Sequence, residues 1–125
     1  MNVVDSSGWL EYFAEGPNAG FFTAAIEKPA DLVVPTISLY EVFKRVLQQR
    51  DHGAALQVIA VMRQGLVVEL TEALAVSAAR LSVKHGLPMA DSIMLATAQA
   101  SDATLWTQDA DFKALPGVRY SAKKA

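Results

Sequence analysis

Short runs of branched apolar residues alternate with longer helix-like stretches, and this alternation restricts the fold more than any other feature of the sequence. The runs lie at residues 2–4, 32–34, 66–70, 104–107 and 118–120. Most are continuous instead of alternating with polar residues, which is typical of strands that are covered on both faces. Such strands are usually parallel, since the connecting helices cover the sheet. The pattern predicts an α/β fold.

The segments between these runs are expected to be helices. They span residues 7–15, 19–27, 36–49, 54–64, 72–85 and 89–100, with a short segment at 110–115. Right-handed crossovers between parallel strands give a doubly wound sandwich, in which ligands bind beyond the carboxyl ends of the strands. We therefore expect functional residues at that edge of the sheet.

The composition fits one globular domain over residues 1–125, because 52% of the residues are hydrophobic and 19% are charged. No apolar run approaches the roughly 20 residues of a membrane-spanning helix, and the start does not resemble a signal peptide, so we expect a cytoplasmic protein. The absence of cysteine excludes zinc ribbons and thiol nucleophiles. A net charge of −2 gives no overall attraction to nucleic acid, so any RNA contacts must be local.

Acidic residues follow two of the predicted strands. Asp5 comes directly after the first strand, while Asp109 and Asp111 follow the strand that ends at Thr107. An aspartate between a strand and a helix is also a preferred N-cap, and Lys113 could form a helical pair with Asp109. Each acid alone therefore has an ordinary structural interpretation.

Two further acids lie near predicted helix starts. Ser38 and Glu41 match a capping box, and Arg45 stands one turn further along. Asp91 is different, because it is the one charged residue between Met89 and Ala100. A carboxylate on an apolar, buried helix requires a cation or must keep its proton.

A parallel α/β fold can bring four of these acids together, namely Asp5, Glu41, Asp91 and Asp109. Clustered carboxylates repel one another, and a hard divalent cation such as Mg²⁺ or Mn²⁺ reverses that penalty. A cation held in this way can polarise a phosphodiester and help to deprotonate an attacking water. The constellation therefore favours a hydrolytic nuclease.

Four segments of the chain resemble PIN-domain ribonucleases: VVDSSGWLEYF, SLYEV, MADSIMLATA and LWTQDADF. In length and opening residues the chain is most similar to the VapC toxins of bacterial toxin-antitoxin pairs. The resemblance implies a PIN-like three-layer sandwich, with a central parallel sheet of about five strands and helices on both faces. It also implies an RNA endonuclease that depends on Mg²⁺ or Mn²⁺, and a cognate antitoxin as partner.

Carried over position by position, the family's acids correspond to Asp5, Glu41, Asp91 and Asp109. Its hydroxyl-bearing auxiliary positions fall on Ser6 and Thr107, and Asp111 is a further auxiliary acid. We also expect a homodimer, because excess apolar surface on a small chain usually has a partner.

Several interpretations remain open at this point. Lys44, Arg45 and Arg50 could contact RNA phosphates or be solvated helix charges. Trp9 and Trp106 could stack on bases, although their positions favour core or dimer contacts. The main alternative to an enzyme is a catalytically silent PIN-like module that binds RNA or protein.

Overall fold

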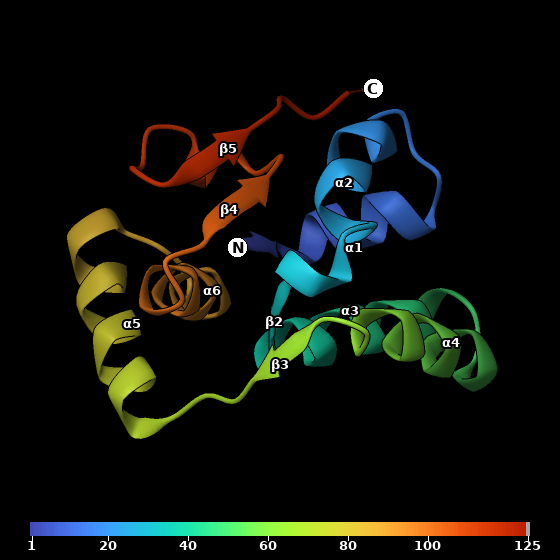
Figure 1. The fold of residues 1–125 in the computed structure, drawn as a ribbon, viewed down its shortest axis with the longest axis horizontal. Coiled ribbons are helices and arrows are strands. Elements are labelled where there is room, and N and C mark those ends of the chain that lie inside the picture. Colours follow the sequence, from blue (N-terminus) through green and yellow to red (C-terminus); the bar gives the residue numbers. More distant parts are fainter. Residues whose placement is uncertain (125) are drawn as a thin grey trace.

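A computed structural model describes residues 1–124, and its elements follow the predicted order (Figure 1). The strands are β1 (Asn2–Val4), β2 (Val33–Pro35), β3 (Leu66–Val68), β4 (Thr104–Thr107) and β5 (Val118–Tyr120). The α-helices are α1 (Ser6–Phe13), α2 (Ala19–Ile26), α3 (Thr36–Gln49), α4 (His52–Met62), α5 (Glu72–His85) and α6 (Met89–Ala100). Two 3₁₀ turns complete the fold, η1 (Pro29–Asp31) and η2 (Ala110–Phe112). None of the helices within residues 1–124 is long and apolar enough to cross a membrane.

The short helix expected at 110–115 is the 3₁₀ turn η2 instead, and it is only three residues long. The chain reaches Pro116 soon after this turn, and the residue before a proline is disfavoured in helical conformation. The strand expected at 66–70 also ends earlier, at Val68.

All strand pairs are parallel, as predicted, but the strands do not form one regular sheet. β1, β4 and β5 form a three-stranded sheet in the order β1-β4-β5, and β2 pairs with β3 in a second sheet. A single parallel bridge between Asn2 and Leu32 connects them. Strands of three or four residues form few ladder hydrogen bonds, so strand twist can separate β2 from β1 beyond this bridge.

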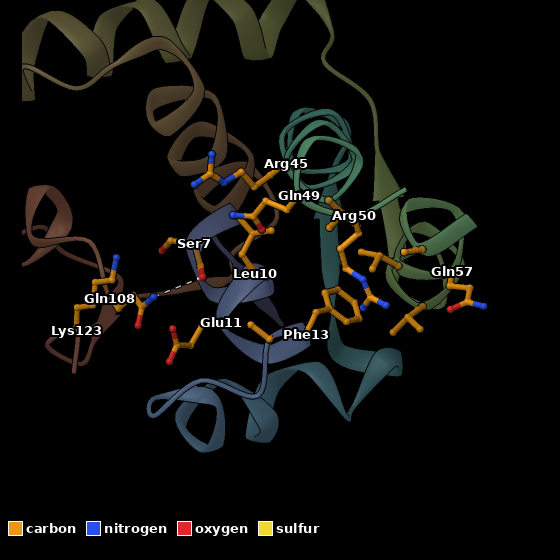
Figure 2. A pocket seen from close by; sticks show the side chains of 15 residues that line it. Ser7, Leu10, Glu11, Phe13, Arg45, Gln49, Arg50, Gln57, Gln108 and Lys123 are labelled. Carbon is orange, nitrogen blue, oxygen red and sulfur yellow. Dashed lines mark hydrogen bonds between the residues drawn. The ribbon is translucent and has the colours of Figure 1, made fainter. Parts of the chain in front are cut away.

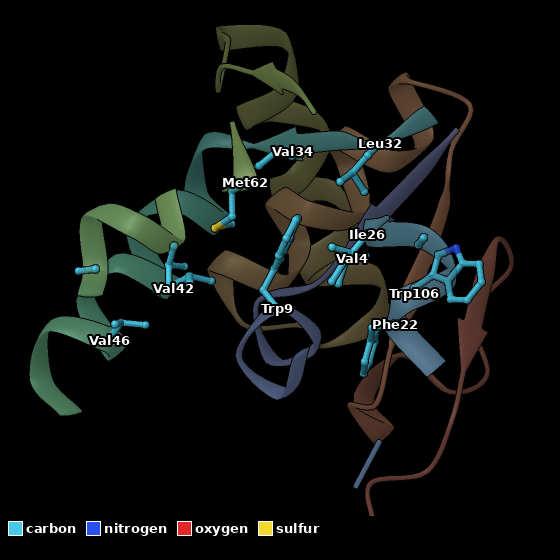
Figure 3. Packing of buried hydrophobic residues seen from close by; sticks show 13 residues of the cluster. Val4, Trp9, Phe22, Ile26, Leu32, Val34, Val42, Val46, Met62 and Trp106 are labelled. Carbon is cyan, nitrogen blue, oxygen red and sulfur yellow. The ribbon is translucent and has the colours of Figure 1, made fainter. Parts of the chain in front are cut away.

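Both faces of β1, β2 and β4 are largely buried, which accounts for their continuous apolar runs, whereas β3 and β5 are more exposed. Successive residues point to opposite faces, so Val3 and Val4 pack into different hydrophobic clusters. The cluster around Val4 also contains Trp9, Phe22 and Trp106 (Figure 3). The two tryptophans are therefore core residues, as their positions favoured, and are too buried to stack on bases.

Paired helices form the outer layers. α6 packs on β1, β2 and β4, and α5 lies against α6 on its outer side (Figure 1). On the opposite face, α1 and α2 pack on β4 and β1 respectively. α3 contacts both α1 and α6, and α4 packs along α3. The fold is thus the expected α/β arrangement with helices on both sides of the strands.

The helix α1 lies close to the strands because Gly8 has no side chain. A Cβ atom at Gly8 would lie 2.5 Å from Phe22 Cε1 and 2.7 Å from Val4 Cγ1. Such distances are shorter than real carbon contacts, so a larger residue would push α1 outward. Because Asp5 and Ser6 stand at the start of α1, this close approach also determines where they lie.

Candidate active site

Asp5 is the centre of a hydrogen-bonded cluster at the carboxyl end of β1. Its carboxylate caps α1 by accepting a hydrogen bond from the Gly8 amide at 2.8 Å. It also accepts one from Ser7 Oγ, 3.0 Å from each oxygen, and one from Thr107 Oγ1 at 2.6 Å. The N-cap interpretation is therefore confirmed, but the side chain has further partners.

The environment of Asp5 disfavours its charged form. Burial raises the pKa of Asp5 from 3.8 to about 6, although the hydrogen bonds from Thr107, Gly8 and Ser7 favour the carboxylate. The nearby negative charge of Asp109 raises the pKa further. A positive ion beside this carboxylate would reverse that cost.

Thr107 connects Asp5 to Asp109. The two neighbouring parallel strands β1 and β4 end at the same edge, with Val4 opposite Trp106, so the residues that follow them meet there. Thr107 Oγ1 donates to Asp5 and accepts a hydrogen bond from the Asp109 backbone N–H at 2.9 Å. The hydroxyl predicted to be auxiliary thus links the two acids that follow these strands.

Asp109 also caps a short turn. Its Oδ1 accepts a hydrogen bond from the Asp111 N–H at 2.9 Å, at the start of η2. Lys113, which the sequence offered as a helical partner for Asp109, has its Nζ 5.9 Å from the centre of the Tyr120 ring. Asp109 therefore has a capping role, as expected, and remains next to Asp5 and Asp91.

The capping box at Ser38 and Glu41 is wrong. Helix α3 begins at Thr36, so Ser38 lies inside its first turn, and the N-cap residue is Pro35. Ser38 Oγ is buried and has no hydrogen-bond partner among residues 1–124. Glu41 instead accepts a hydrogen bond from Ser6 Oγ at 2.6 Å. The partner of Glu41 is thus 35 residues away in sequence and holds α3 against the start of α1.

Asp91 is the third residue of α6 and is half-buried between the other acids. Burial is the main cause that raises the pKa of Asp91 from 3.8 to about 7. The negative charges of Asp109, Asp5, Glu41 and Asp111 raise it further, in that order. The structure therefore brings the other four predicted acids within electrostatic reach of Asp91, although the five come from four separate segments of the chain.

The geometry of three of these acids suits a metal ion. Asp91, Asp109 and Asp111 each offer a carboxylate oxygen, and these oxygens lie within 4.8 Å of one another. Hard divalent cations such as Mg²⁺ and Mn²⁺ prefer oxygen ligands of this kind. Burial and then the neighbouring negative charges raise the pKa values of Asp5 and Asp91, and a bound cation would offset both effects. The residues present therefore fit a divalent cation.

A groove lies between α1 and the α3–α4 pair, and Ser7 and Gln108 at its edge are chain neighbours of the acidic cluster (Figure 2). Its volume is about 580 Å³, and its walls combine apolar side chains such as Phe13 with Arg45 and Arg50. A second cavity of about 500 Å³ borders Asp109 and shares Ser7, Gln108 and Lys123 with the groove. The acidic cluster and the groove are thus adjacent, and two of the basic residues considered for RNA contact line the groove.

Sequence reasoning missed two residues near the cluster. Ser7 donates to Asp5, and its position two residues after a capping aspartate is the signal that could have identified it. Gln108 is buried between Thr107 and Asp109, and its side chain approaches the Ser7 carbonyl (Figure 2). A polar residue directly after a buried strand was the corresponding signal for Gln108.

Known proteins that resemble the chain share its fold along nearly its whole length. The structure of a toxin-antitoxin complex from Klebsiella pneumoniae has a TM-score of 0.81 and 21% identity, covering 95% of this chain and 96% of that one. The sarcin-ricin-loop-cleaving toxin VapC20 of Mycobacterium tuberculosis has a TM-score of 0.77 and 21% identity, covering 93% and 95%. VapBC2 from Rickettsia felis, bound to a fragment of promoter DNA, has a TM-score of 0.73 and 12% identity, covering 97% of each chain.

A family model also matches the sequence, in the region that carries the acidic cluster. No curated protein sequence matches the chain. The family model described as "PIN domain", however, matches residues 3–118, a segment that contains every acid of the cluster. The family match covers most of the chain, and the fold agrees with the structures above, so the chain belongs to the PIN-domain family.

Proposed function

We propose that this protein is a metal-dependent endoribonuclease that acts as the toxin of a toxin-antitoxin pair. The observation that carries the proposal is the convergence of the Asp91, Asp109 and Asp111 carboxylates, whose oxygens lie within 4.8 Å of one another. Membership of the PIN-domain family and the likeness to toxin-antitoxin structures support it. An acidic cluster at the carboxyl ends of parallel strands, beside a groove, suits the hydrolysis of a phosphodiester.

Asp91, Asp109 and Asp111 would hold the ion, and Asp5 and Glu41 complete its negative surroundings. When bound, Mg²⁺ or Mn²⁺ supplies the positive charge that polarises a phosphodiester and favours the deprotonation of water. The hydroxyl groups have positioning roles. Ser6 donates to Glu41, and Thr107 donates to Asp5, so each acid is oriented by a neighbour that carries no charge.

Cleavage of RNA by purified protein tests the proposal. With Mn²⁺ present, the wild type should cleave RNA internally and leave 5′-phosphate ends, and EDTA should abolish the activity. Asp91→Asn should be inactive, whereas Asp31→Asn, an exposed aspartate of η1, should keep wild-type activity. Cleavage that persists in both EDTA and Asp91→Asn would overturn the metal-dependent mechanism. RNA binding without any cleavage would instead support the catalytically silent module.

The proposed toxin function also implies a protein partner. The groove beside the acids is lined by apolar and basic residues, which suits a protein segment as well as RNA. We propose that a cognate antitoxin closes this groove and places a basic side chain among the carboxylates. Expression of the toxin alone should arrest growth, and co-expression of the antitoxin should restore it and yield a copurifying complex. Growth arrest by Asp91→Asn as well would contradict this interpretation.

A homodimer is the remaining part of the proposal. Large apolar side chains are exposed on several elements, including Val83 on α5 at 88% and Met89 on α6 at 72%. Exposed apolar residues of this size favour a partner surface. Light scattering should therefore give twice the mass of one chain. A monomer at high concentration would contradict the proposed homodimer but not the proposed nuclease activity.

A further inference from the structure

Two buried side-chain amides lie next to segments that carry acids of the cluster. Asn18 and Gln108 are only 1% and 6% exposed, and Asn18 Nδ2 donates a hydrogen bond to Gln108 Oε1 at 3.1 Å. The two residues are 90 positions apart in the sequence. We call them the buried amide pair. Buried amides are costly unless they are hydrogen-bonded, so this pair requires its partners.

The buried amide pair joins separate segments of the chain. Asn18 Oδ1 accepts a hydrogen bond from Ser121 Oγ at 3.3 Å, and the Asn18 N–H donates to Glu11 Oε2 at 2.7 Å. Gln108 Nε2 approaches the Ser7 carbonyl oxygen at 3.5 Å. The pair therefore ties together α1, the turn before α2, the segment after β4 and the segment after β5.

Two of these segments carry three of the acids, namely Asp5, Asp109 and Asp111. Gln108 lies in the chain between Thr107, which donates to Asp5, and Asp109. Ser7, which Gln108 approaches, donates from its hydroxyl to both carboxylate oxygens of Asp5. The amides thus hold the backbone of both acid-bearing segments, while the hydroxyl groups hold the carboxylates themselves.

We propose that Asn18 and Gln108 are positioning residues of the acidic site, which set the distance between the Asp5 and Asp109 segments. The effect on catalysis rests on the proposed ribonuclease function, whereas the effect on metal binding rests only on the proposed metal site. Groups that orient metal ligands from behind typically change metal affinity or activity by about 10- to 100-fold when they are removed. If the pair were purely structural, its removal would change only the stability of the fold.

The test compares variants of the pair with a matched control. Gln108→Met keeps the length of the side chain but removes its hydrogen bonds, and Asn18→Ala removes the partner. The control is Asn2→Ala, because Asn2 Oδ1 accepts a hydrogen bond from Trp106 Nε1 at 2.8 Å and also joins β1 to β4. Asn2 lies at the start of β1, at the opposite end of the strand from Asp5.

For each folded protein, calorimetry measures the Kd for Mn²⁺. A cleavage assay at a temperature below the melting transition measures kcat and KM for RNA. Both pair variants should raise the Kd for Mn²⁺ and lower kcat by about 10-fold or more, with KM unchanged. The double variant should lose no more than the worse single variant, because the two side chains act as one unit. Asn2→Ala should lower the melting temperature but keep the wild-type Kd and kcat.

Two results distinguish the inference from its alternatives. Pair variants that melt at lower temperature but keep the wild-type Kd and kcat would overturn the positioning role. The exchange variant, Asn18→Gln with Gln108→Asn, keeps the summed length of the two side chains and should recover Mn²⁺ affinity relative to Gln108→Met. A wild type that binds Mn²⁺ but cleaves no RNA would remove the proposed function, while weaker Mn²⁺ binding by the pair variants would still support positioning.

Discussion

Replacing Asp91 by asparagine should stabilise the metal-free protein at neutral pH. Asp91 has a pKa raised from 3.8 to about 7, so its ionised form is unfavourable in the folded state and favourable in the unfolded state. A folded-state pKa above the unfolded value means that the native protein binds more protons. The contribution of Asp91 to the free energy of unfolding therefore falls as pH rises from about 4 to about 7, and is constant above that. Asparagine has no such dependence.

The size of the effect follows from the pKa values. Raising the pKa from 3.8 to about 7 corresponds to about 4 kcal/mol, which we reduce to about 2 kcal/mol because Asp91 is only half-buried and solvent screens its charge. Asp91 is the third residue of α6, where the helix dipole favours a negative charge by about 0.5 kcal/mol. Burial and charge repulsion together outweigh the helix dipole, so asparagine gains about 1.5 kcal/mol in net stability. For a domain of 125 residues this raises the melting temperature by about 4–8 °C.

Thermal unfolding in EDTA measures this gain. Wild type, Asp91→Asn and the exposed control Asp31→Asn should be compared at pH 4 and pH 8. Asp91→Asn should melt above the wild type at pH 8 but close to the wild type at pH 4, where both side chains are neutral in the folded protein. Asp31→Asn should change the free energy of unfolding by less than about 0.5 kcal/mol at either pH. A lower melting temperature for Asp91→Asn at pH 8, or an equal gain at both pH values, would refute the argument from clustered charge.

Three further predictions concern metal binding and packing. Mn²⁺ at a hundred times its Kd should stabilise the wild type by about 2.7 kcal/mol but not Asp91→Asn, and equal thermal shifts in both would show that the acid does not bind the ion. Gly8→Ala should lower the free energy of unfolding in urea by about 1–3 kcal/mol, since its Cβ would lie 2.5 Å from Phe22. Gly20→Ala should be neutral or stabilising, because a Cβ there would meet no atom within 4 Å. Ser38→Ala should stabilise the protein by about 1 kcal/mol, because the buried Ser38 hydroxyl has no partner among residues 1–124. Ser92→Ala should destabilise the protein, because it removes a 2.7 Å hydrogen bond from Ser92 Oγ to the Met89 carbonyl. A destabilised Ser38→Ala in urea unfolding would contradict that assignment.

The sequence was sufficient for those features that depend on local pattern. The helices α3, α5 and α6 begin and end where the apolar periodicity placed them, and the apolar strands β1, β2 and β4 are covered on both faces, whereas β3 and β5 are not. The shared edge of β1 and β4 also followed from their parallel pairing, which places Asp5 near Asp109. These features are set by neighbours in the chain and by the rules of parallel sheets.

Features that depend on distant partners could not be predicted. Ser38 and Glu41 have the spacing of a capping box, but Pro35 starts the helix earlier and Ser6 becomes the partner of Glu41. The strands divide into two sheets that a single bridge connects, and no local pattern encodes this division. Likewise, nothing near Asn18 in the sequence indicates that it meets Gln108. The sequence could therefore predict that the acids gather at the carboxyl edge of the strands, but it could not predict which groups orient them.

The hydrogen bond between Thr107 and Asp5 joins residues that are 102 positions apart, and this distance has a consequence for synthesis. The ribosome makes Asp5 well before β4 and the acid that follows that strand. A nascent chain that stops before β4 lacks the strand that pairs with β1, and it also lacks Thr107 and Asp109. Its acidic cluster is therefore incomplete. Translation products that end before Asp109 would be without the site, so only a chain that extends past this residue can acquire whatever activity that site confers.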